Sequence, residues 1–209
     1  MGKYAELFKK EKYYKKAKLE GYRARSAYKL KDIQMKFNIF KQAFYILDLG
    51  SAPGSWLQVI KENVEENLNK YKDFRDHYKI MGIDLKKLSP IEGVKIIQGD
   101  ITDPTLEEHI LSYFGEEVDL IVSDASINKT GNKFTDQINQ INLCSVILDL
   151  TKKMLKMGGN IVIKVFQGTD FNNFVKKLKQ EFKIVNSYKP KSSRKTSNEI
   201  YLIGLKKFS

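Results

Sequence analysis

The chain has 209 residues, of which 42% are hydrophobic, 11% aromatic and 30% charged, and its formal net charge at pH 7 is +12. This length and composition predict one globular domain over residues 1–209 and exclude disordered, collagen-like and disulfide-stapled proteins. No apolar run approaches the roughly 18 residues of a membrane-spanning helix, and a single cysteine with two distant histidines makes a metal site unexpected.

Helical and extended patterns alternate along the chain. Helices are expected over 3–19, 25–37, 56–64, 104–114, about 134–157 and 170–182, and strands over 44–50, 79–85, 94–101, 118–126, 160–166, 183–190 and 199–208. We expect Gly158 and Gly159 to end the long helix and Asp170 to cap the last one. The alternation predicts an α/β fold with a mostly parallel sheet and helices on both faces.

Acidic residues lie at the ends of the first three predicted strands. The segment DLGSAPGSW (48–56) joins the first strand to a helix, with Gly50 allowing a tight turn and Gly54 the close approach of a ligand. Asp84 and Asp100 end the next two strands, where acids can bind ribose hydroxyls and an adenine amine. There is no G-x-G-x-x-G for a pyrophosphate, so an adenosyl group without phosphates fits better, and S-adenosylmethionine is the natural candidate. The alternative is an ordinary strand–helix turn with two glycines.

Several motifs together make the chain resemble the FtsJ/RrmJ family of S-adenosylmethionine-dependent RNA 2′-O-ribose methyltransferases. They are YYKKAKLEGYRARSAYKL (13–30), DLGSAPGSW, IDLKKLSPIEGVKIIQGDI (83–101), SDAS (123–126), GGNIVIKVFQG (158–168) and KPKSSRKTSNEIYLIG (189–204). The resemblance implies a Rossmann-like, doubly wound sheet of seven strands, mostly parallel with an antiparallel last strand. It also implies S-adenosyl-L-methionine bound by Asp48, Gly50, Ser51, Pro53, Gly54, Trp56, Asp84, Leu85, Asp100, Ile101 and Asp124.

The resemblance further implies a catalytic tetrad of Lys29, Asp124, Lys164 and Glu199. Lys164 interrupts an apolar strand, where a buried ammonium is costly unless it is paired, and Asp124 follows the neighbouring strand. In this reading Lys164 is the general base and must be neutral when it takes the proton of a ribose 2′-hydroxyl, while Lys29 positions the ribose or a phosphate. A buried salt bridge that only neutralises Lys164 is the alternative. One departure is that residues 125–128 (ASIN) lack the proline that the family usually has there.

Charge is distributed unevenly. Residues 1–31 hold 11 Lys/Arg against 3 Asp/Glu, residues 176–209 hold 10 against 2, and the middle holds 16 against 20. Because the tetrad joins both ends, we expect one basic surface that binds RNA phosphates, with the N-terminal helices of 1–31 contributing. Its expected members are Arg23, Arg25, Lys31, Lys189, Lys191, Arg194 and Lys195, with Tyr4, Tyr13, Tyr14, Tyr22 and Tyr28 as candidates for stacking on bases. A lysine-rich, merely solvated surface is the alternative.

The expected partner is therefore RNA, with no DNA, no membrane and a monomeric state. By resemblance the substrate is a uridine of large-subunit ribosomal RNA, free or in a ribosomal particle. A tRNA anticodon-loop methyltransferase and a non-catalytic RNA-binding or assembly factor on the same fold stay open. The first 31 residues leave no room for a cleavable presequence, so the cytoplasm is the expected location, with a mitochondrial or nucleolar address not excluded.

Overall fold

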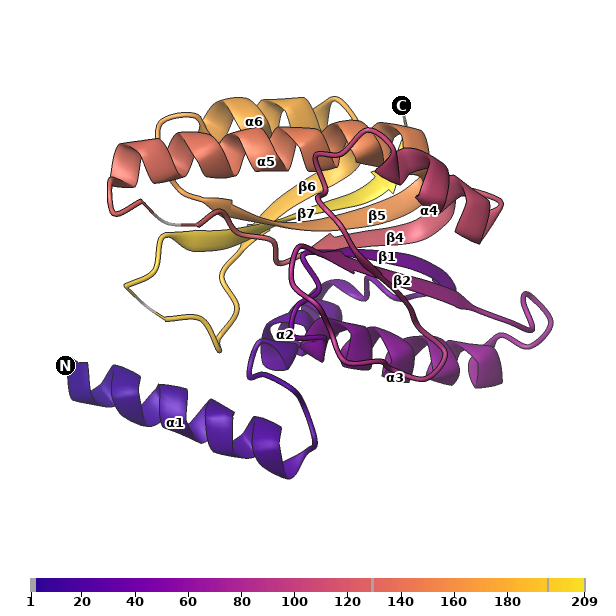
Figure 1. Ribbon diagram of the computed structural model, residues 1–209, viewed down its shortest axis with the longest axis horizontal. Coiled ribbons are helices and arrows are strands. Elements are labelled where there is room, and N and C mark those ends of the chain that lie inside the picture. The colour runs from indigo at the N-terminus through magenta and orange to yellow at the C-terminus, as the bar shows by residue number, and fades with distance from the viewer. Residues whose placement is uncertain (1–2, 129, 195, 209) are drawn as a thin grey trace.

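The computed structural model describes residues 3–128, 130–194 and 196–208, with side chains from residue 11 onward (Figure 1). The elements in chain order are α1 (Lys3–Leu19), α2 (Ala27–Phe37), β1 (Tyr45–Leu49), α3 (Ser55–Lys70), β2 (Lys79–Asp84), β3 (Lys95–Gln98), α4 (Leu106–Phe114), β4 (Val118–Ser123), α5 (Lys133–Met154), β5 (Leu155–Phe166), α6 (Phe171–Lys179), β6 (Phe182–Tyr188) and β7 (Glu199–Lys207). None of the helices in these described ranges is long and apolar enough to cross a membrane.

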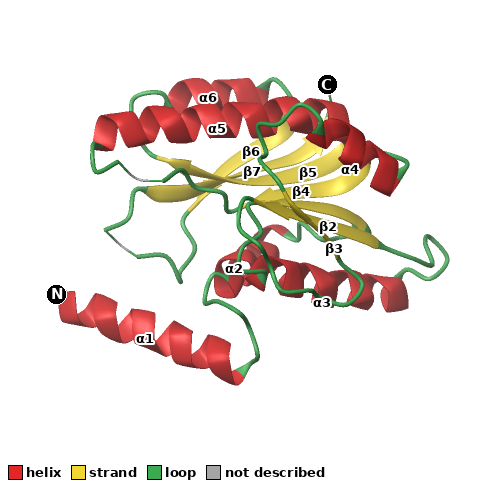
Figure 2. Cartoon of the chain, in the orientation of Figure 1, coloured by secondary structure: helices red, strands yellow, loops and turns green. Residues whose placement is uncertain are grey.

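The seven strands form one sheet in the order β3-β2-β1-β4-β5-β7-β6. All neighbouring pairs from β3 to β5 are parallel, whereas β7 runs antiparallel to both β5 and β6. Helices α4, α5 and α6 cover one face of the sheet, and α2 and α3 cover the other (Figure 2). The predicted Rossmann-like, doubly wound α/β fold with an antiparallel last strand is confirmed. Its switch point lies between β1 and β4, where the strand order reverses.

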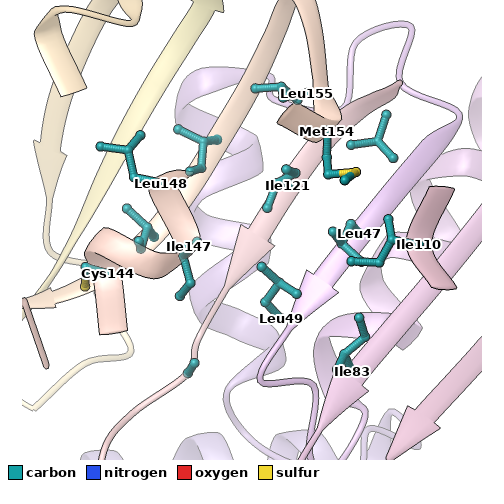
Figure 3. Close-up of a cluster of buried hydrophobic side chains, with 14 of the residues drawn as sticks. Leu47, Leu49, Ile83, Ile110, Ile121, Cys144, Ile147, Leu148, Met154 and Leu155 are labelled. Carbon is teal, nitrogen blue, oxygen red and sulfur yellow. The ribbon is translucent and has the colours of Figure 1, made fainter. Parts of the chain in front are cut away.

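Two hydrophobic clusters hold the helices to the sheet. Alternate strand residues face opposite sides, so Leu47 and Leu49 of β1 pack with Ile147 of α5 in one cluster (Figure 3). Ile46 joins the other cluster, under α2 and α3, together with Trp56. Because both faces of the central strands are covered, β1 and β4 are buried along their whole length and are mostly apolar in sequence.

The end of α5 differs from the prediction. The helix stops at Met154, and Gly158 and Gly159 lie inside β5 instead of ending the helix. Gly158 has φ +79°, and a Cβ on Gly159 would come within 2.7 Å of the Leu155 side chain. The pairing of β5 with β4 also shifts register here, so the two glycines allow a bulge at the start of the strand.

The expected cap of α6 also differs. Asp170 does occupy the N-cap position, but its side chain makes no capping hydrogen bond. Its main-chain oxygen accepts from Phe174 N at 3.0 Å instead.

Helix α1 projects from the layered body and touches it through few residues (Figure 1). The ring of Tyr13 packs on Tyr28 at 5.4 Å between centroids, and Ala17 is buried. Tyr22 and Tyr28 are buried as well, with their rings 5.9 Å apart. These two tyrosines are core residues, which corrects the expectation that they stack on bases.

Candidate active site

Five polar side chains meet at the carboxyl ends of the central strands. The Lys164 ammonium donates to the carbonyl of Asp124 and lies 3.1 Å from its Oδ1. The Lys29 ammonium lies 3.2 Å from Glu199 Oε1 and 3.6 Å from Asp124 Oδ1, and donates to the hydroxyl of Tyr201 at 3.0 Å. That hydroxyl donates in turn to Asp124 Oδ1 at 2.5 Å. The four predicted tetrad residues are therefore in contact, and Tyr201 is a fifth member that the sequence analysis missed.

The pairing of β5 with β7 explains this arrangement. Lys164 lies opposite Tyr201, and Phe166 lies opposite Glu199. Glu199 and Tyr201 are two positions apart, with only Ile200 between them, so both side chains point to the same face of β7. The spacing E-x-Y in NEIYL is the signal in the sequence, but it has meaning only once β7 is known to pair with the strand that carries Lys164.

The charges in this group stabilise one another. Burial alone would raise the pKa of the Asp124 carboxyl, but Lys164 and Lys29 outweigh it and hold that pKa below its usual value. The pKa of Glu199 is likewise held low, mainly by Lys29, against the effect of burial. Burial and the neighbouring Asp124 carboxylate raise the pKa of the Tyr201 hydroxyl well above its usual value. At neutral pH the site therefore contains two carboxylates and a protonated tyrosine.

Gln140 of α5 holds the loop that lacks the expected proline. Its side chain is fully buried and donates to the main-chain oxygens of Ala125 and Lys164, both at 3.1 Å. Its own oxygen accepts from Ile127 N at 3.2 Å. A side-chain amide thus supplies from α5 the constraint that a proline would supply within the loop.

The loop after β1 is tied to the ends of β2 and β4. Gly50 N and Ser51 N both donate to the carbonyl of Ile83, and Ala52 N donates to Asp84 Oδ2 at 2.8 Å. Gly50 has φ +81°, and a Cβ there would come within 2.5 Å of the Cα of Ala125. Only glycine fits at this turn, and the first amides of α3 follow from Ser55, at the end of the same loop.

Asp48 is a buried carboxyl without a hydrogen-bond partner among the described residues. Its side chain has no exposed surface, and neither carboxyl oxygen accepts a hydrogen bond. The Ser51 hydroxyl donates instead to the main-chain oxygens of Asp48 and Ile83. Burial and the nearby Asp124 carboxylate raise the pKa of Asp48 well above its usual value. This end of the sheet is therefore an environment that favours positive charge.

The outer part of the predicted cofactor crevice is open to solvent. Asp84 Oδ1 caps the turn after β2 by accepting from Lys86 N, and Leu85 is exposed. Gly99 N donates to the carbonyl of Asp84, which brings the exposed Asp100 close to that turn. Asp100 lies two residues beyond the end of β3, and Ile101 follows it half-buried. The predicted cofactor residues thus line neighbouring strand ends.

Trp56 joins the loop after β1 to the five-residue group. It is buried in the first turn of α3, and its Nε1 donates to the carbonyl of Ser26 at 2.9 Å. Its ring lies 5.8 Å from that of Tyr201. The Ser26 hydroxyl also lies 2.7 Å from that of Ser55, so the starts of α2 and α3 are held together.

Arg23 joins the loop after β1 to the segment after β2 through hydrogen bonds to main-chain carbonyls. Its guanidinium donates to the carbonyls of Ser89 and Pro90, both at 2.7 Å, and of Pro53 at 3.3 Å. A Cβ on Gly54 would lie 2.7 Å from Nη1 of Arg23, so the side chain occupies the room beside that glycine. The guanidinium thus binds main-chain carbonyls, and its expected place on an RNA-facing surface stays a prediction.

The other predicted basic residues differ in their surroundings. Burial and the nearby Arg194 lower the pKa of Arg25, and Glu199 also acts on it, so both arginines lie near the five-residue group. Lys31 pairs with Glu62 at 3.3 Å, and Lys189 donates to the carbonyl of Ser197 at 2.6 Å. Lys191 is exposed and anchored by its main-chain N–H, which donates to Asp32. Lys195 and the side chain of Tyr4 lie outside the described residues.

An open cleft borders Glu199. Its walls come from the start of α5, the end of β5 and the segment before β7, and its lining residues are Gly131, Lys133, Asp136, Gln137, Phe166, Thr196, Ser197, Asn198 and Glu199. The Ser197 hydroxyl donates to Glu199 Oε2 at 2.7 Å, which orients the carboxylate. The five-residue group is thus reached from outside on the side of Glu199.

The fold and its acid-lined switch point are those of a Rossmann-like methyltransferase. The sequence model of the FtsJ-like methyltransferase family matches residues 22–207, and the chain therefore belongs to that family.

Similar proteins agree with this assignment. A "Ribosomal RNA large subunit methyltransferase E" of Methanothrix thermoacetophila is 43% identical over 96% of this chain and 74% of its own length. One of Rickettsia akari with the same name is 40% identical over 93% and 84%.

Solved structures give the same result. The crystal structure of a ribosomal RNA methyltransferase from Plasmodium falciparum matches with a TM-score of 0.75 and 34% identity, covering 89% of this chain and 98% of that one. A chain of a fibrillarin/Nop5p complex, 18% identical with a TM-score of 0.57 over 88% and 84%, shares the fold.

Proposed function

We propose that the protein transfers a methyl group from S-adenosyl-L-methionine to a ribose 2′-hydroxyl of large-subunit ribosomal RNA, with the whole chain, 1–209, acting as one methyltransferase unit. The observation that carries this proposal is the contact between Lys164 and Asp124, buried beside an open cleft and next to the loop after β1. Family membership supports the reaction class, and the names of the relatives support the substrate.

The residues of the crevice fit the cofactor. Bound S-adenosylmethionine supplies a methyl group that is already activated by a positively charged sulfur. Asp48, Asp84 and Asp124 act on one another electrostatically at three strand ends, and such a group of acids favours a cationic ligand. The close-packed turn at Gly50 and the amides at the start of α3 would hold the polar end of the ligand. Trp56, the exposed Leu85 and the half-buried Ile101 would provide apolar contacts.

In the proposed reaction, Lys164 removes the proton of the hydroxyl. The ribose 2′-oxygen would form a bond to the methyl carbon while the carbon–sulfur bond breaks, and the hydroxyl proton would pass to Nζ of Lys164, which must have lost its own proton to solvent beforehand. Asp124 then balances the ammonium, because its carboxylate stays ionised beside Lys164 and Lys29. Lys29 and Glu199 orient the ribose at the mouth of the cleft, and this positioning accounts for much of the expected rate.

The basic residues near the cleft would bind phosphates. Arg25 and Arg194 lie near each other and near Glu199, and two adjacent guanidinium groups are suited to binding an anion. Lys133 lines the cleft itself. The basic helix α1 projects from the same end of the molecule as the segment before β7 and the start of α5 (Figure 1). We propose that these elements together contact one RNA strand along its phosphate backbone.

The direct test is to incubate the purified protein with S-adenosylmethionine labelled in the methyl group and with unmodified large-subunit ribosomal RNA, ribosomal particles or tRNA. The 2′-O-methylated positions are then mapped. We expect label on one ribose of the large-subunit RNA. Label on tRNA alone would mean that tRNA, and not ribosomal RNA, is the substrate. Label on a base would refute methyl transfer to the ribose. RNA binding without cofactor binding would favour an assembly factor.

A further inference from the structure

One exposed aromatic side chain borders the active-site region. Four described aromatic residues are exposed: Tyr14, Phe74, Phe134 and Phe208. Tyr14 is on the projecting helix α1, Phe74 stacks on Phe44 in the loop after α3, and Phe208 is near the C-terminus. Phe134, which is 60% exposed, lies in the first turn of α5. Single exposed apolar side chains are common on protein surfaces, so the place of Phe134 in the fold carries the argument and its exposure alone does not.

Phe134 lines a small hollow that adjoins the cleft at Glu199. The hollow is also lined by Gln137 and Phe166, and these two residues line the cleft as well. The side chain of Gln137 packs against Gly168, where a Cβ would come within 2.2 Å of its Oε1, and it donates to the carbonyl of Gln167. The ring of Phe134 therefore lies in a hollow that shares two wall residues with the cleft.

The first turn of α5 is well anchored, so the ring is presented from a fixed backbone. The Asn132 side chain caps the helix by accepting from Phe134 N at 3.0 Å and Thr135 N at 3.2 Å. Asp136 accepts from both the main-chain N–H and the hydroxyl of Thr130. The ring of Phe134 and the ammonium group of Lys133 are neighbours near a polar cleft. A base can stack on such a ring while the adjacent phosphate contacts the ammonium group.

We propose that Phe134 is a stacking platform for a nucleobase next to the ribose that is methylated. This inference rests on the proposed function and adds to it a base-binding position outside the five-residue group. Stacking on an aromatic ring tolerates any base, so Phe134 would contribute affinity and register more than sequence preference. It also supplies the aromatic contact that the buried Tyr22 and Tyr28 cannot make.

The experiment compares two single-stranded probes of equal length, a 15-nucleotide oligouridylate and an abasic ribose-phosphate oligomer. We expect Phe134→Ala and Phe134→Leu to weaken binding of oligouridylate about fivefold or more, in the range of base–aromatic stacking. Binding of the abasic oligomer should not change, and Phe134→Trp should bind oligouridylate as well as the wild type. Phe74→Leu is the matched control, because Phe74 is equally exposed, at 59%, but outside the cleft. It should bind both probes normally.

Two results would overturn the inference. Equal weakening with both probes would mean that Phe134 acts through the backbone of the loop, and unchanged binding would assign the ring to a different partner. Thermal unfolding of each variant checks that the fold is intact. If the wild type transfers no methyl group to any RNA, the proposed function itself fails. If it does transfer one and the Phe134 variants bind normally, only this inference fails.

Discussion

The hydroxyl of Tyr201 donates to Asp124 Oδ1 at 2.5 Å, while the same hydroxyl accepts from Lys29 at 3.0 Å. Tyr201 is fully buried, so it fixes the carboxylate between two lysines without competition from water. Asp124 therefore has three neighbours that favour its ionised form, and it can balance a proton held on Lys164.

Replacing this tyrosine by phenylalanine tests its positioning role. We expect Tyr201→Phe to lower the rate of methyl transfer about tenfold, equivalent to about 1.4 kcal/mol, and to destabilise the fold by about 1.5–3 kcal/mol, as for other hydrogen bonds to charged groups. Tyr113→Phe is the matched control, since its hydroxyl donates to the carbonyl of Ile80, near the amino end of β2 and so at the opposite edge of the sheet from the five-residue group. A variant at position 201 with normal kcat and stability would show that the hydroxyl is dispensable.

Gln140 offers a prediction about stability. Gln140→Leu removes two donors and leaves the buried main-chain oxygens of Ala125 and Lys164 without that partner. The free energy of unfolding should fall by about 2–4 kcal/mol, because unsatisfied buried polar groups are costly. Denaturant unfolding measures this, with the exposed Asn142→Ala on the same helix as control. A loss no greater than that of the control would mean that the loop does not depend on Gln140.

Asp48 predicts an unusual dependence on pH. Because burial and Asp124 raise its pKa in the folded protein, the unfolded chain releases this proton first, from about pH 4 upward. Stability therefore falls with rising pH between the unfolded and folded pKa values, by up to about 1.4 kcal/mol per pH unit. Asp48→Asn cannot titrate, so its unfolding free energy should lack this decline above about pH 4. Parallel curves for the two proteins would contradict the assignment.

Substitutions of Arg23 and Arg25, which are two positions apart in the sequence, should separate cofactor binding from RNA binding. Arg23 donates to three carbonyls in the segments around the predicted cofactor residues, so Arg23→Ala should weaken S-adenosylmethionine binding about tenfold and RNA binding little. Arg25→Ala should do the reverse and reduce the salt dependence of RNA binding by about 0.7 in log–log slope per lost phosphate contact. Isothermal titration with each ligand measures both effects. If Arg23→Ala weakened only RNA binding, its structural role would be wrong.

The sequence predicts the sheet well, because buried parallel strands appear as short apolar runs and their last residues, such as Asp84, share one edge. It misplaces the end of α5, because Gly158 and Gly159 resemble a helix stop although they belong to a bulge in β5. Features that depend on long-range packing are not visible in it. The carbonyls that bind Arg23 lie 30, 66 and 67 residues away along the chain.

The same limit applies to the candidate site. Lys29, Asp124, Lys164 and Glu199 are recognisable from motifs, whereas Tyr201 gains its place only from the register between β5 and β7. Tyr22 and Tyr28, which the sequence offers as candidates for stacking on bases, are buried because their rings pack on each other and Tyr28 also packs on Tyr13 of α1.

The most direct test of the proposed reaction is a single-turnover measurement of methyl transfer by Lys164→Ala and Lys164→Met. General-base catalysis contributes about 10²–10⁴-fold, so both variants should lose at least 100-fold in rate. Binding of S-adenosylmethionine and of RNA should remain close to that of the wild type, and the exposed Lys152→Ala should be fully active. Turnover by Lys164→Ala at the rate of the wild-type protein would contradict the role of Lys164 as the general base.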